Sequence, residues 1–374
     1  LKDLSNLKDD TIHLAVELGK SGFKTHNYAL VSLPINTVSR FLLLPEENGK
    51  KYVIILDDVI RFCLGDVFSL FGYDTYSAYT IKFTRDAEMD IDNDVSKSFL
   101  EIMSESVKQR KKGEPVRFVY DKKIPEPLLK KVIKKFNITK RDHIRAGGRY
   151  HNFKDFMGFP RIGSHDLVYP SSPPLAHPEL PPNKSIIKTI KHKDIMLHYP
   201  YQSFQYIIDF LREASIDPLV RAIKMTFYRA ARDSSVMNAL INAARNGKQV
   251  TVFMELQARF DEEANIYWTQ KLQDEGVKVI QSIPGFKVHS KLILVRRKEN
   301  GENIYYANIS TGNFNESTAK IYADDSLLTG KQEITQEVNK VFHLFESKFI
   351  MPTFTTLIVA PFYIRNFFMK MLAS

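Results

Sequence analysis

The chain has 374 residues and a single cysteine, Cys63, so it can form neither an intrachain disulfide nor a zinc site built from cysteines. Hydrophobic residues make up 44% and charged residues 26%, a balance that excludes wholesale disorder. Lys and Arg number 53 against 43 Asp and Glu, and the formal net charge of +10 predicts an anionic partner or substrate. Nucleic acid, anionic lipid head groups and chains of phosphate groups all fit this charge.

The sequence predicts a protein without a membrane span. No run reaches the ~18 uncharged apolar residues that a spanning helix needs. The N-terminus begins Leu-Lys-Asp-Leu-Ser and lacks the apolar segment of a secretory signal. Together with the single cysteine, these features favour a reducing cytoplasm. The chain begins with Leu1 rather than Met, which indicates a fragment or a processed chain.

The length predicts about two domains of roughly 150 residues each. Six prolines fall within residues 170–182, and no helix or central strand can run through them. We place a connector there, between an N-terminal domain at 1–195 and a second domain at 196–350. The first domain mixes strand and helix patterns, which favours an α+β fold. Its strand patterns lie at 28–33, 52–56 and 116–120, and its helix patterns lie at 94–111 and 126–136.

The second domain alternates strands with helices. A strand at 219–228 precedes a helix that Asp233 caps and that ends at Gly247. The predicted order βαβαβ with a final hairpin indicates a mixed α/β sheet whose functional edge lies at the carboxyl ends of its strands. The remaining elements are a strand at 249–256, a helix at 262–275, and strands at 277–281, 287–295 and 304–310.

Two arginines directly follow strands of this predicted sheet. Arg229 follows the strand at 219–228, and Arg259 follows the strand at 249–256. If these strands are parallel, both guanidinium groups reach one crevice and can hold a phosphate group by paired hydrogen bonds. The alternative is that the arginines are surface residues that pair with Asp233 and Asp261.

The strand at 287–295 carries a His-x-Lys pair. On a strand, His289 and Lys291 lie on the same face, roughly 7 Å apart along the backbone. A neutral imidazole can attack phosphorus and carry the phosphoryl group, while a nearby ammonium group neutralises the phosphate oxygens. The alternative is a structural histidine on a half-buried strand.

The segment at 308–315 ends the next strand with one Gly and three Asn residues. If the two strands pair, we expect its amide and backbone groups to provide hydrogen-bond donors beside His289. Turn formation alone explains Gly312 and Asn313 equally well.

The His-x-Lys pair, the following strand and Thr-Gly-Asn at 311–313 resemble half of the phospholipase D-type fold, in which two such halves face each other. Arg296 stands where the pattern His-x-Lys-x4-Asp has its Asp. The resemblance therefore implies the fold and argues against ordinary phosphodiester hydrolysis.

Longer segments resemble the bacterial polyphosphate kinases of the first type, the histidine-phosphorylating family. In the second domain these segments are 222–233, 255–265, 287–291 and 310–316. In the first domain, segments 84–88, 114–120 and 147–155 resemble that family's head domain. The similarity extends over nearly the whole chain.

This resemblance implies roles for individual residues. His289 corresponds to the family's phosphohistidine, with Lys291 beside it as the second catalytic residue. Arg229 and Arg259 correspond to arginines at the family's magnesium–phosphate site. Because arginine cannot ligate a cation, we expect them to hold phosphate oxygens beside the metal. Tyr322 corresponds to a nucleotide-contacting tyrosine, although pattern alone describes it as an aromatic residue at a strand edge.

The implied reaction is the reversible transfer of the ATP γ-phosphoryl group to inorganic polyphosphate, through phosphorylated His289 and with Mg²⁺ as cofactor. The implied substrates are ATP or ADP and polyphosphate, and no nucleic acid is involved. The family also implies a homo-oligomer, located in the cytoplasm or peripherally at the inner membrane.

The family architecture implies that 1–195 is a head domain and 196–350 the first of two phospholipase D-like catalytic domains. Residues 351–374, with a strand pattern at 355–361 and a helix pattern at 363–372, then begin a truncated second catalytic domain. Read alone, this tail is an amphipathic terminal helix that docks on the core. We expect a fragment with little or no polyphosphate synthesis by itself.

Two rival functions stay open. A phospholipase D-type phosphodiesterase could complete its site by dimerisation, and a non-catalytic basic module could bind nucleic acid or another polyanion. The sequence lacks a stacked-aromatic or helix-turn-helix signature for nucleic-acid binding.

Overall fold

The chain folds into two units, which are described here from a computed structural model. Unit 1 comprises Leu1–Ile91 and Glu105–Pro170, and unit 2 comprises Asp92–Ser104 and Ser171–Ser374. The structure describes residues 7, 11–24, 26–85, 98–110, 115–138, 144–170, 172–231, 233–256, 258, 261–281, 287–347 and 352–373.

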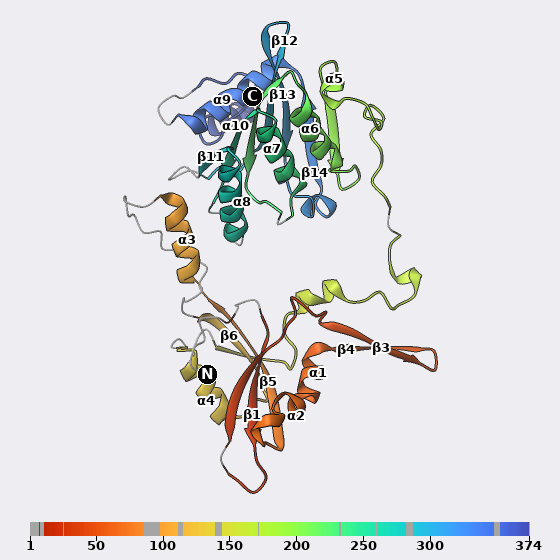
Figure 1. Cartoon of the computed structure of the whole chain (residues 1–374), viewed down its shortest axis with the longest axis vertical. Coiled ribbons are helices and arrows are strands. Elements are labelled where there is room, and N and C mark those ends of the chain that lie inside the picture. The colour runs from red at the N-terminus through yellow and green to blue at the C-terminus, as the bar shows by residue number, and fades with distance from the viewer. Residues whose placement is uncertain are drawn as a thin grey trace. The chain divides into compact units, whose positions relative to one another are not determined.

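Unit 1 contains a largely antiparallel sheet and a separate hairpin (Figure 1). Its strands are β1 (His13–Gly19), β2 (Asn27–Ser32), β3 (Phe41–Glu47), β4 (Lys50–Ile55), β5 (Thr75–Arg85), β6 (Pro115–Asp121) and β7 (Ile144–Gly147). The sheet has the order β2-β1-β5-β6-β7, and only β6 and β7 pair in parallel among its described strands. The hairpin joins β3 to β4.

Helices pack on the faces of this sheet. On one face, Phe118 of the sheet packs in a cluster with Leu128 and Val132. On the other face, Val16 packs with Leu64. The helical segments of unit 1 are α1 (Leu56–Phe62), α2 (Leu64–Val67), η1 (Ser69–Phe71), α4 (Glu126–Lys135), η3 (Phe153–Gly158) and η4 (His165–Leu167). The helix α3 (Phe99–Arg110) has residues in both units.

Unit 2 contains a mixed sheet with both parallel and antiparallel pairs. Its strands are β8 (Ile195–Tyr199), β9 (Val220–Phe227), β10 (Gln249–Met254), β11 (Lys278–Gln281), β12 (Lys291–Glu299), β13 (Glu302–Ser310) and β14 (Asp324–Thr329). The order across the sheet is β11-β10-β9-β12-β13-β14-β8. β9, β10 and β11 run parallel, and β12 pairs antiparallel with β9. The prediction of mixed α/β folding is therefore confirmed.

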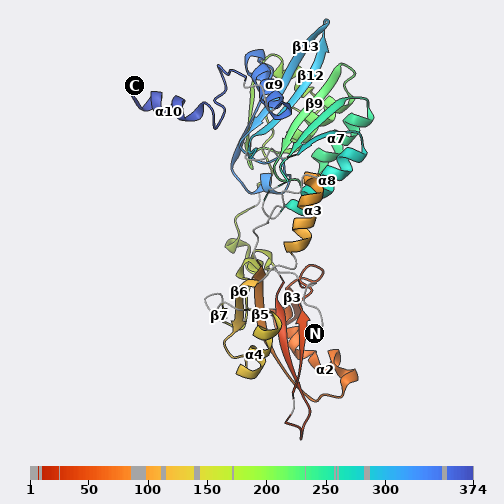
Figure 2. The same ribbon diagram turned by 90° about the vertical axis from the view of Figure 1, so that its left-hand side faces the viewer.

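Helices lie on both faces of the unit 2 sheet. The helical segments of this unit are α5 (Ile186–Ile190), α6 (Gln205–Ile216), α7 (Ser235–Arg245), α8 (Glu262–Asp274), η5 (Thr318–Lys320), α9 (Gln332–Glu346) and α10 (Ile364–Ala373), of which α10 projects away from the sheet (Figure 2). α7 and α8 lie on the face opposite α9 (Figures 1 and 2). The buried side chains of Leu292 and Leu294 pack against Val338 and Phe342 of α9.

The helix predicted after β9 forms, but its cap lies one residue later than predicted. Ser234, not Asp233, is the N-cap, and its hydroxyl accepts a hydrogen bond from the backbone N–H of Met237. A capping oxygen must reach the free N–H groups of the first turn, and Ser234 directly precedes that turn. Gly247 follows the helix with φ at +76°, which permits the sharp reversal.

The tail differs from the strand predicted at 355–361. Thr355 and Leu357 instead donate backbone hydrogen bonds to the buried carboxylate of Glu337, each at 2.7 Å. These groups therefore bond to α9 rather than to a neighbouring strand. α10 follows, close to the predicted helix, and none of its residues is buried. No helix among the described residues is long and apolar enough to cross a membrane.

Several strands of the unit 2 sheet begin or end at the same edge. β9 and β10 end there, and β12 begins there because it runs antiparallel to β9. β13 ends at this edge and β14 begins there, since each pairs antiparallel with its neighbour. This edge carries the candidate site.

Candidate active site

The ring of Tyr228 lies at the centre of the candidate site. Tyr228 directly follows β9 and contacts the imidazole of His289 edge to face, with ring centroids 4.8 Å apart and an interplanar angle of 86°. Three cationic groups surround the same ring: the Arg229 guanidinium carbon at 5.6 Å, and the Nζ atoms of Lys287 and Lys291, each at 5.8 Å from the centroid. A ring face attracts such cations electrostatically. We call these residues the Tyr228 cluster.

The antiparallel pairing of β12 with β9 assembles this cluster. Ile293 faces Met225 in the register, so the beginning of β12 lies next to the end of β9. Thr226 reinforces this junction because its hydroxyl donates to the carbonyl of Ser290 at 2.7 Å and accepts from the N–H of Leu292 at 2.9 Å. Residues distant in sequence thereby meet at one sheet edge.

His289 precedes the strand on which it was predicted to lie. The strand begins at Lys291, and residues 287–290 have no regular secondary structure. The physical reason is that a side chain, not a neighbouring strand, accepts the backbone hydrogen bond here. The N–H of Val288 donates to the buried carboxylate of Glu255 at 3.3 Å. His289 therefore has an exposed side chain, unlike the half-buried structural histidine of the alternative reading.

Electrostatics favour the neutral form of His289. Partial burial lowers the pKa of the imidazole, and the positive charges of Lys291, Lys287 and Arg229 lower it further. Near neutral pH the ring therefore carries a free nitrogen lone pair, which is the nucleophilic form.

Lys291 is held firmly beside His289. Its side chain is buried, and its ammonium group donates a hydrogen bond to the His289 carbonyl oxygen. Burial lowers the pKa of Lys291, while the negative charge of Asp324 opposes that shift. The ammonium group thus lies between the histidine backbone and the acidic start of β14.

Arg229 takes part in two interactions at once. Besides its contact with Tyr228, its guanidinium forms an ion pair with Asp261 at 2.5 Å. Burial raises the pKa of Asp261, and the charge of Arg229 partly offsets this. The alternative interpretation of Arg229, a surface residue that pairs with an aspartate, therefore has its ion pair. The same guanidinium still contacts the Tyr228 ring. Arg259 lies outside the described residues.

One of the donors predicted in the segment 308–315, the amide of Asn308 at the end of β13, serves the sheet instead. Asn308 is fully buried, and its amide group donates to the hydroxyl of Ser326 and the carbonyl of Leu327 in β14. The expectation that it donates beside His289 is wrong, because the sheet interior uses these donors. A Cβ atom on Gly312 would lie only 2.5 Å from the carboxylate of Asp324, so only glycine fits this turn.

Tyr322 lies on the turn after η5, with 61% of its surface exposed. Its backbone N–H bonds to the carbonyl of Thr318. Within the described part of the chain, no aromatic or cation contact joins its ring to the Tyr228 cluster. The structure therefore brings together His289, Lys291 and Arg229, and among the described residues it shows no contact of the Tyr322 ring with them.

Sequence reasoning missed Tyr228, Lys287 and Asn265. Asn265 is fully buried, and its amide donates to the carbonyls of Tyr228 at 3.0 Å and of Glu255 at 2.9 Å. It thus ties the end of β9 to the end of β10. A polar residue on the buried face of α8 was the available signal, whereas nothing in the local pattern singled out the ring of Tyr228.

The described residues show no group of three or more His, Cys, Asp or Glu side chains that could hold a metal ion. Magnesium is commonly bound by one or two carboxylates together with phosphate oxygens. Asp261, beside Arg229, is a carboxylate close to the cluster, but by itself it does not define a protein-built magnesium site.

Comparison with known proteins places the chain in one family. The family model for the polyphosphate kinase middle domain matches residues 2–159, and the model for polyphosphate kinase C-terminal domain 1 matches residues 185–350. The polyphosphate kinases of Escherichia coli (strain K12) and Salmonella typhimurium are 48% and 47% identical over 360 residues. These matches cover 95% of this chain and 52% of each relative, so the chain spans about half the length of these curated relatives.

Structural comparison agrees. The crystal structure of polyphosphate kinase from Porphyromonas gingivalis matches with a TM-score of 0.75 at 31% identity, covering 98% of this chain and 53% of that one. The two family models together account for most of the residues, and both describe the same enzyme. The chain therefore belongs to the polyphosphate kinase family.

Proposed function

We propose that this chain carries the phosphoacceptor site of a polyphosphate kinase, in which His289 reversibly takes the γ-phosphoryl group of ATP and passes it to inorganic polyphosphate. The observation that supports this most is the exposed imidazole with a lowered pKa, in edge contact with a ring that three cationic groups surround. A neutral nucleophile within a positive field suits attack on a phosphate group.

The proposed transfer consists of two balanced steps. A ring nitrogen of His289 uses its lone pair to form an N–P bond, while the bond from the γ-phosphorus to the bridging oxygen breaks and ADP leaves with the electron pair. The ring keeps its one N–H proton and carries a positive charge while phosphorylated. A terminal oxygen of polyphosphate then attacks phosphorus, and the P–N bond breaks to restore the neutral imidazole.

The cations supply most of what this reaction needs. Phosphoryl transfer depends on positioning and on neutralising charge at the phosphate oxygens rather than on covalent help. We assign this task to Lys287, Lys291 and Arg229, whose charges converge at Tyr228. Asp261 orients the Arg229 guanidinium through their ion pair.

Several parts of the proposal rest on the family resemblance alone. They are Arg259 as a second phosphate-holding arginine, Tyr322 as a nucleotide contact, and Mg²⁺ bound beside these arginines through phosphate oxygens. The division into a head domain at 1–195, a first catalytic domain at 196–350 and the start of a second at 351–374 has the same basis. So do assembly into a homo-oligomer and a location in the cytoplasm or at the inner membrane.

The test is labelling of the chain with γ-labelled ATP and Mg²⁺. We expect acid-labile, alkali-stable label on the peptide that contains His289, and we expect His289→Gln to abolish it. His198→Gln is the matched control, since His198 is also exposed in unit 2 and contacts an aromatic ring, Tyr201. Label that persists in His289→Gln would move the nucleophile elsewhere. Hydrolysis of a chromogenic phosphodiester that depends on His289 would favour the phosphodiesterase instead.

A further inference from the structure

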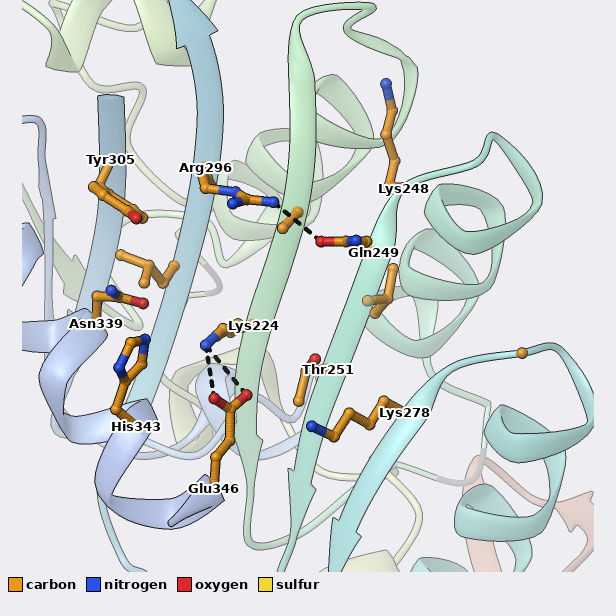
Figure 3. A pocket seen from close by; sticks show the side chains of 14 residues that line it. Lys224, Lys248, Gln249, Thr251, Lys278, Arg296, Tyr305, Asn339, His343 and Glu346 are labelled. Carbon is orange, nitrogen blue, oxygen red and sulfur yellow. Dashed lines mark hydrogen bonds and ion pairs between the residues drawn. The ribbon is translucent and has the colours of Figure 1, made fainter. Parts of the chain in front are cut away.

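A second positively charged site lies on the face of the unit 2 sheet next to α9. It is a pocket of about 710 Å³, and none of its lining residues belongs to the Tyr228 cluster. Lys224 lies in the pocket and four residues before Tyr228, roughly 13 Å away along the strand direction. Figure 3 shows the pocket between the open part of the sheet and α9.

The floor of the pocket consists of two rows of side chains that the strand register aligns. One row crosses four strands from Lys278 through Thr251 and Lys224 to Leu294. The next row contains Gln249, Ala222, Arg296 and Tyr305. Because neighbouring strands lie about 4.8 Å apart, the first row carries two ammonium-bearing residues roughly 10 Å apart.

Positive charge dominates the lining. The lining contains four cationic residues and a single carboxylate, that of Glu346. The ammonium group of Lys248 donates to the backbone carbonyl of Asp217, which is outside the lining. Glu346 pairs with Lys224 at 3.2 Å. No carboxylate in the described ranges forms an ion pair with Lys248, Lys278 or Arg296. The pocket therefore has an excess of positive charge that a multiply charged anion could neutralise.

Arg296 lines the pocket and has one buried donor without a partner in the described part of the chain. Its Nη2 donates to the side-chain oxygen of Gln249 at 3.0 Å, which orients the guanidinium. Its Nε is buried and has no hydrogen-bond partner among the described residues. A buried donor without a partner is costly, and an anion that accepts from it removes that cost. Figure 3 shows Arg296 and Lys248 at one end of the pocket and Lys224 and Lys278 at the other.

The composition of this sheet face is unusual for parallel strands. Such strands are normally covered on both faces and carry apolar residues there. Here α9 covers β12 through Leu292 and Leu294 and β13 through Ala307, while the neighbouring β9, β10 and β11 carry Lys224, Thr251 and Lys278. Toward the carboxyl ends, Phe253 of β10 packs on Phe345 of α9 with ring centroids 4.9 Å apart. This aromatic contact separates the pocket from the edge that carries His289.

We infer that this pocket binds a short stretch of a phosphate chain, as a second anion site apart from His289. The residues provide several positive charges and hydrogen-bond donors, and the only ring side chains in the lining are Tyr305 and His343, both on the side of the pocket away from Lys278 (Figure 3). This chemistry recognises phosphates rather than a nucleobase. That the natural ligand is inorganic polyphosphate, held away from the transfer site, rests on the proposed function.

The test measures binding of tripolyphosphate by calorimetry at about 0.1 M salt, where exposed charges act over roughly 10 Å. We use the Arg229→Ala chain to weaken binding at the Tyr228 cluster. In this background, Lys278→Glu should lower the affinity by at least about tenfold, because it removes one charge-assisted contact and adds repulsion. Lys278 is exposed on the edge strand β11, so the variant should fold.

Lys188→Glu is the matched control, because it changes the net charge equally at an exposed position on α5. It should change the affinity by less than about twofold, as surface charges outside a site contribute little. Equal effects of the two variants, or no saturable binding in the Arg229→Ala chain, would overturn the inference. Tighter binding of ATP than of tripolyphosphate, with competition by adenosine, would make the pocket a nucleotide site and overturn it as well.

A second measurement locates the ligand directly. Tripolyphosphate should protect Lys278 and Lys224 from a small acylating reagent, as read by peptide mass spectrometry, and should leave Lys188 unprotected. The same protection is expected in His289→Gln, because no pocket residue takes part in phosphoryl transfer. Loss of histidine labelling with protection intact would refute only the proposed function. Phosphorylation of His289 without protection of Lys278 and Lys224 would refute only the inference that the pocket binds a phosphate chain.

Discussion

The ring of Tyr228 makes a specific prediction about the reactivity of His289. Tyr228→Leu keeps an apolar side chain but removes the aromatic face, whereas Tyr228→Phe keeps that face and removes only the hydroxyl group. If the ring positions the imidazole and gathers the cations, Tyr228→Leu should slow phosphorylation of His289 and Tyr228→Phe should not.

The magnitude follows from the contacts. The edge-to-face pair with His289 is worth about 0.5–1.5 kcal/mol. Each of the three cation contacts is worth roughly 0.5–1 kcal/mol at a partly exposed site. Interactions among neighbours are not additive, so we expect a total loss of about 1.5–3 kcal/mol. This corresponds to a rate reduced by about 10-fold to 160-fold.

Phosphoramidate provides the assay, because it phosphorylates histidine without a nucleotide site. The rate of label incorporation at the His289 peptide is followed by mass spectrometry between about pH 5 and pH 9, which spans the titration of histidine. Loss of the ring should also expose the imidazole and disperse the cations, so the pKa of His289 should rise toward its ordinary value. The acid limb of the rate profile should therefore move to higher pH in Tyr228→Leu.

A merely structural role for Tyr228 would leave that acid limb in place. Unfolding curves of the three proteins establish whether the variants fold. A Tyr228→Leu chain that folds, reacts at the wild-type rate and keeps the wild-type pH profile would refute the reasoning. Equal slowing in Tyr228→Phe would show that the hydroxyl group, not the ring, is responsible.

Two further predictions concern stability. Gly312→Ala should destabilise unit 2 by about 1–3 kcal/mol in denaturant unfolding, because the new Cβ would collide with Asp324. Gly158→Ala is the control, since a Cβ there meets no atom within 4 Å, and equal destabilisation by both variants would contradict the prediction. Burial alone would raise the pKa of Glu337, but hydrogen bonds from the backbone at 355–357 outweigh burial and lower the pKa to about 2 from 4.5. That depressed pKa contributes at most about 3 kcal/mol, present above pH 4.5 and lost as the pH falls toward 2. Glu337→Gln should therefore lower stability at neutral pH and approach the wild type near pH 2; a pH-independent difference would contradict the linkage.

Local patterns predicted most elements of unit 2 well. The strands around β9 and β10 and the helices α7 and α8 follow from apolar periodicity and from the glycine after each helix, which are properties of neighbouring residues. The cap of α7 and the beginning of β12 were misplaced because hydrogen bonds from side chains decide them. Thr226 and Glu255, distant in sequence, supply the bonds at β12.

By itself, the sequence determined which chemical groups are available: a His-x-Lys pair, an arginine after a strand, and a surplus of positive charge. Only the tertiary structure decided which of them meet. The antiparallel pairing of β12 with β9 brings Tyr228 and Arg229 to His289, and the strand register aligns Lys278 with Lys224. Cross-strand neighbours depend on packing between distant segments, and no local periodicity encodes that packing.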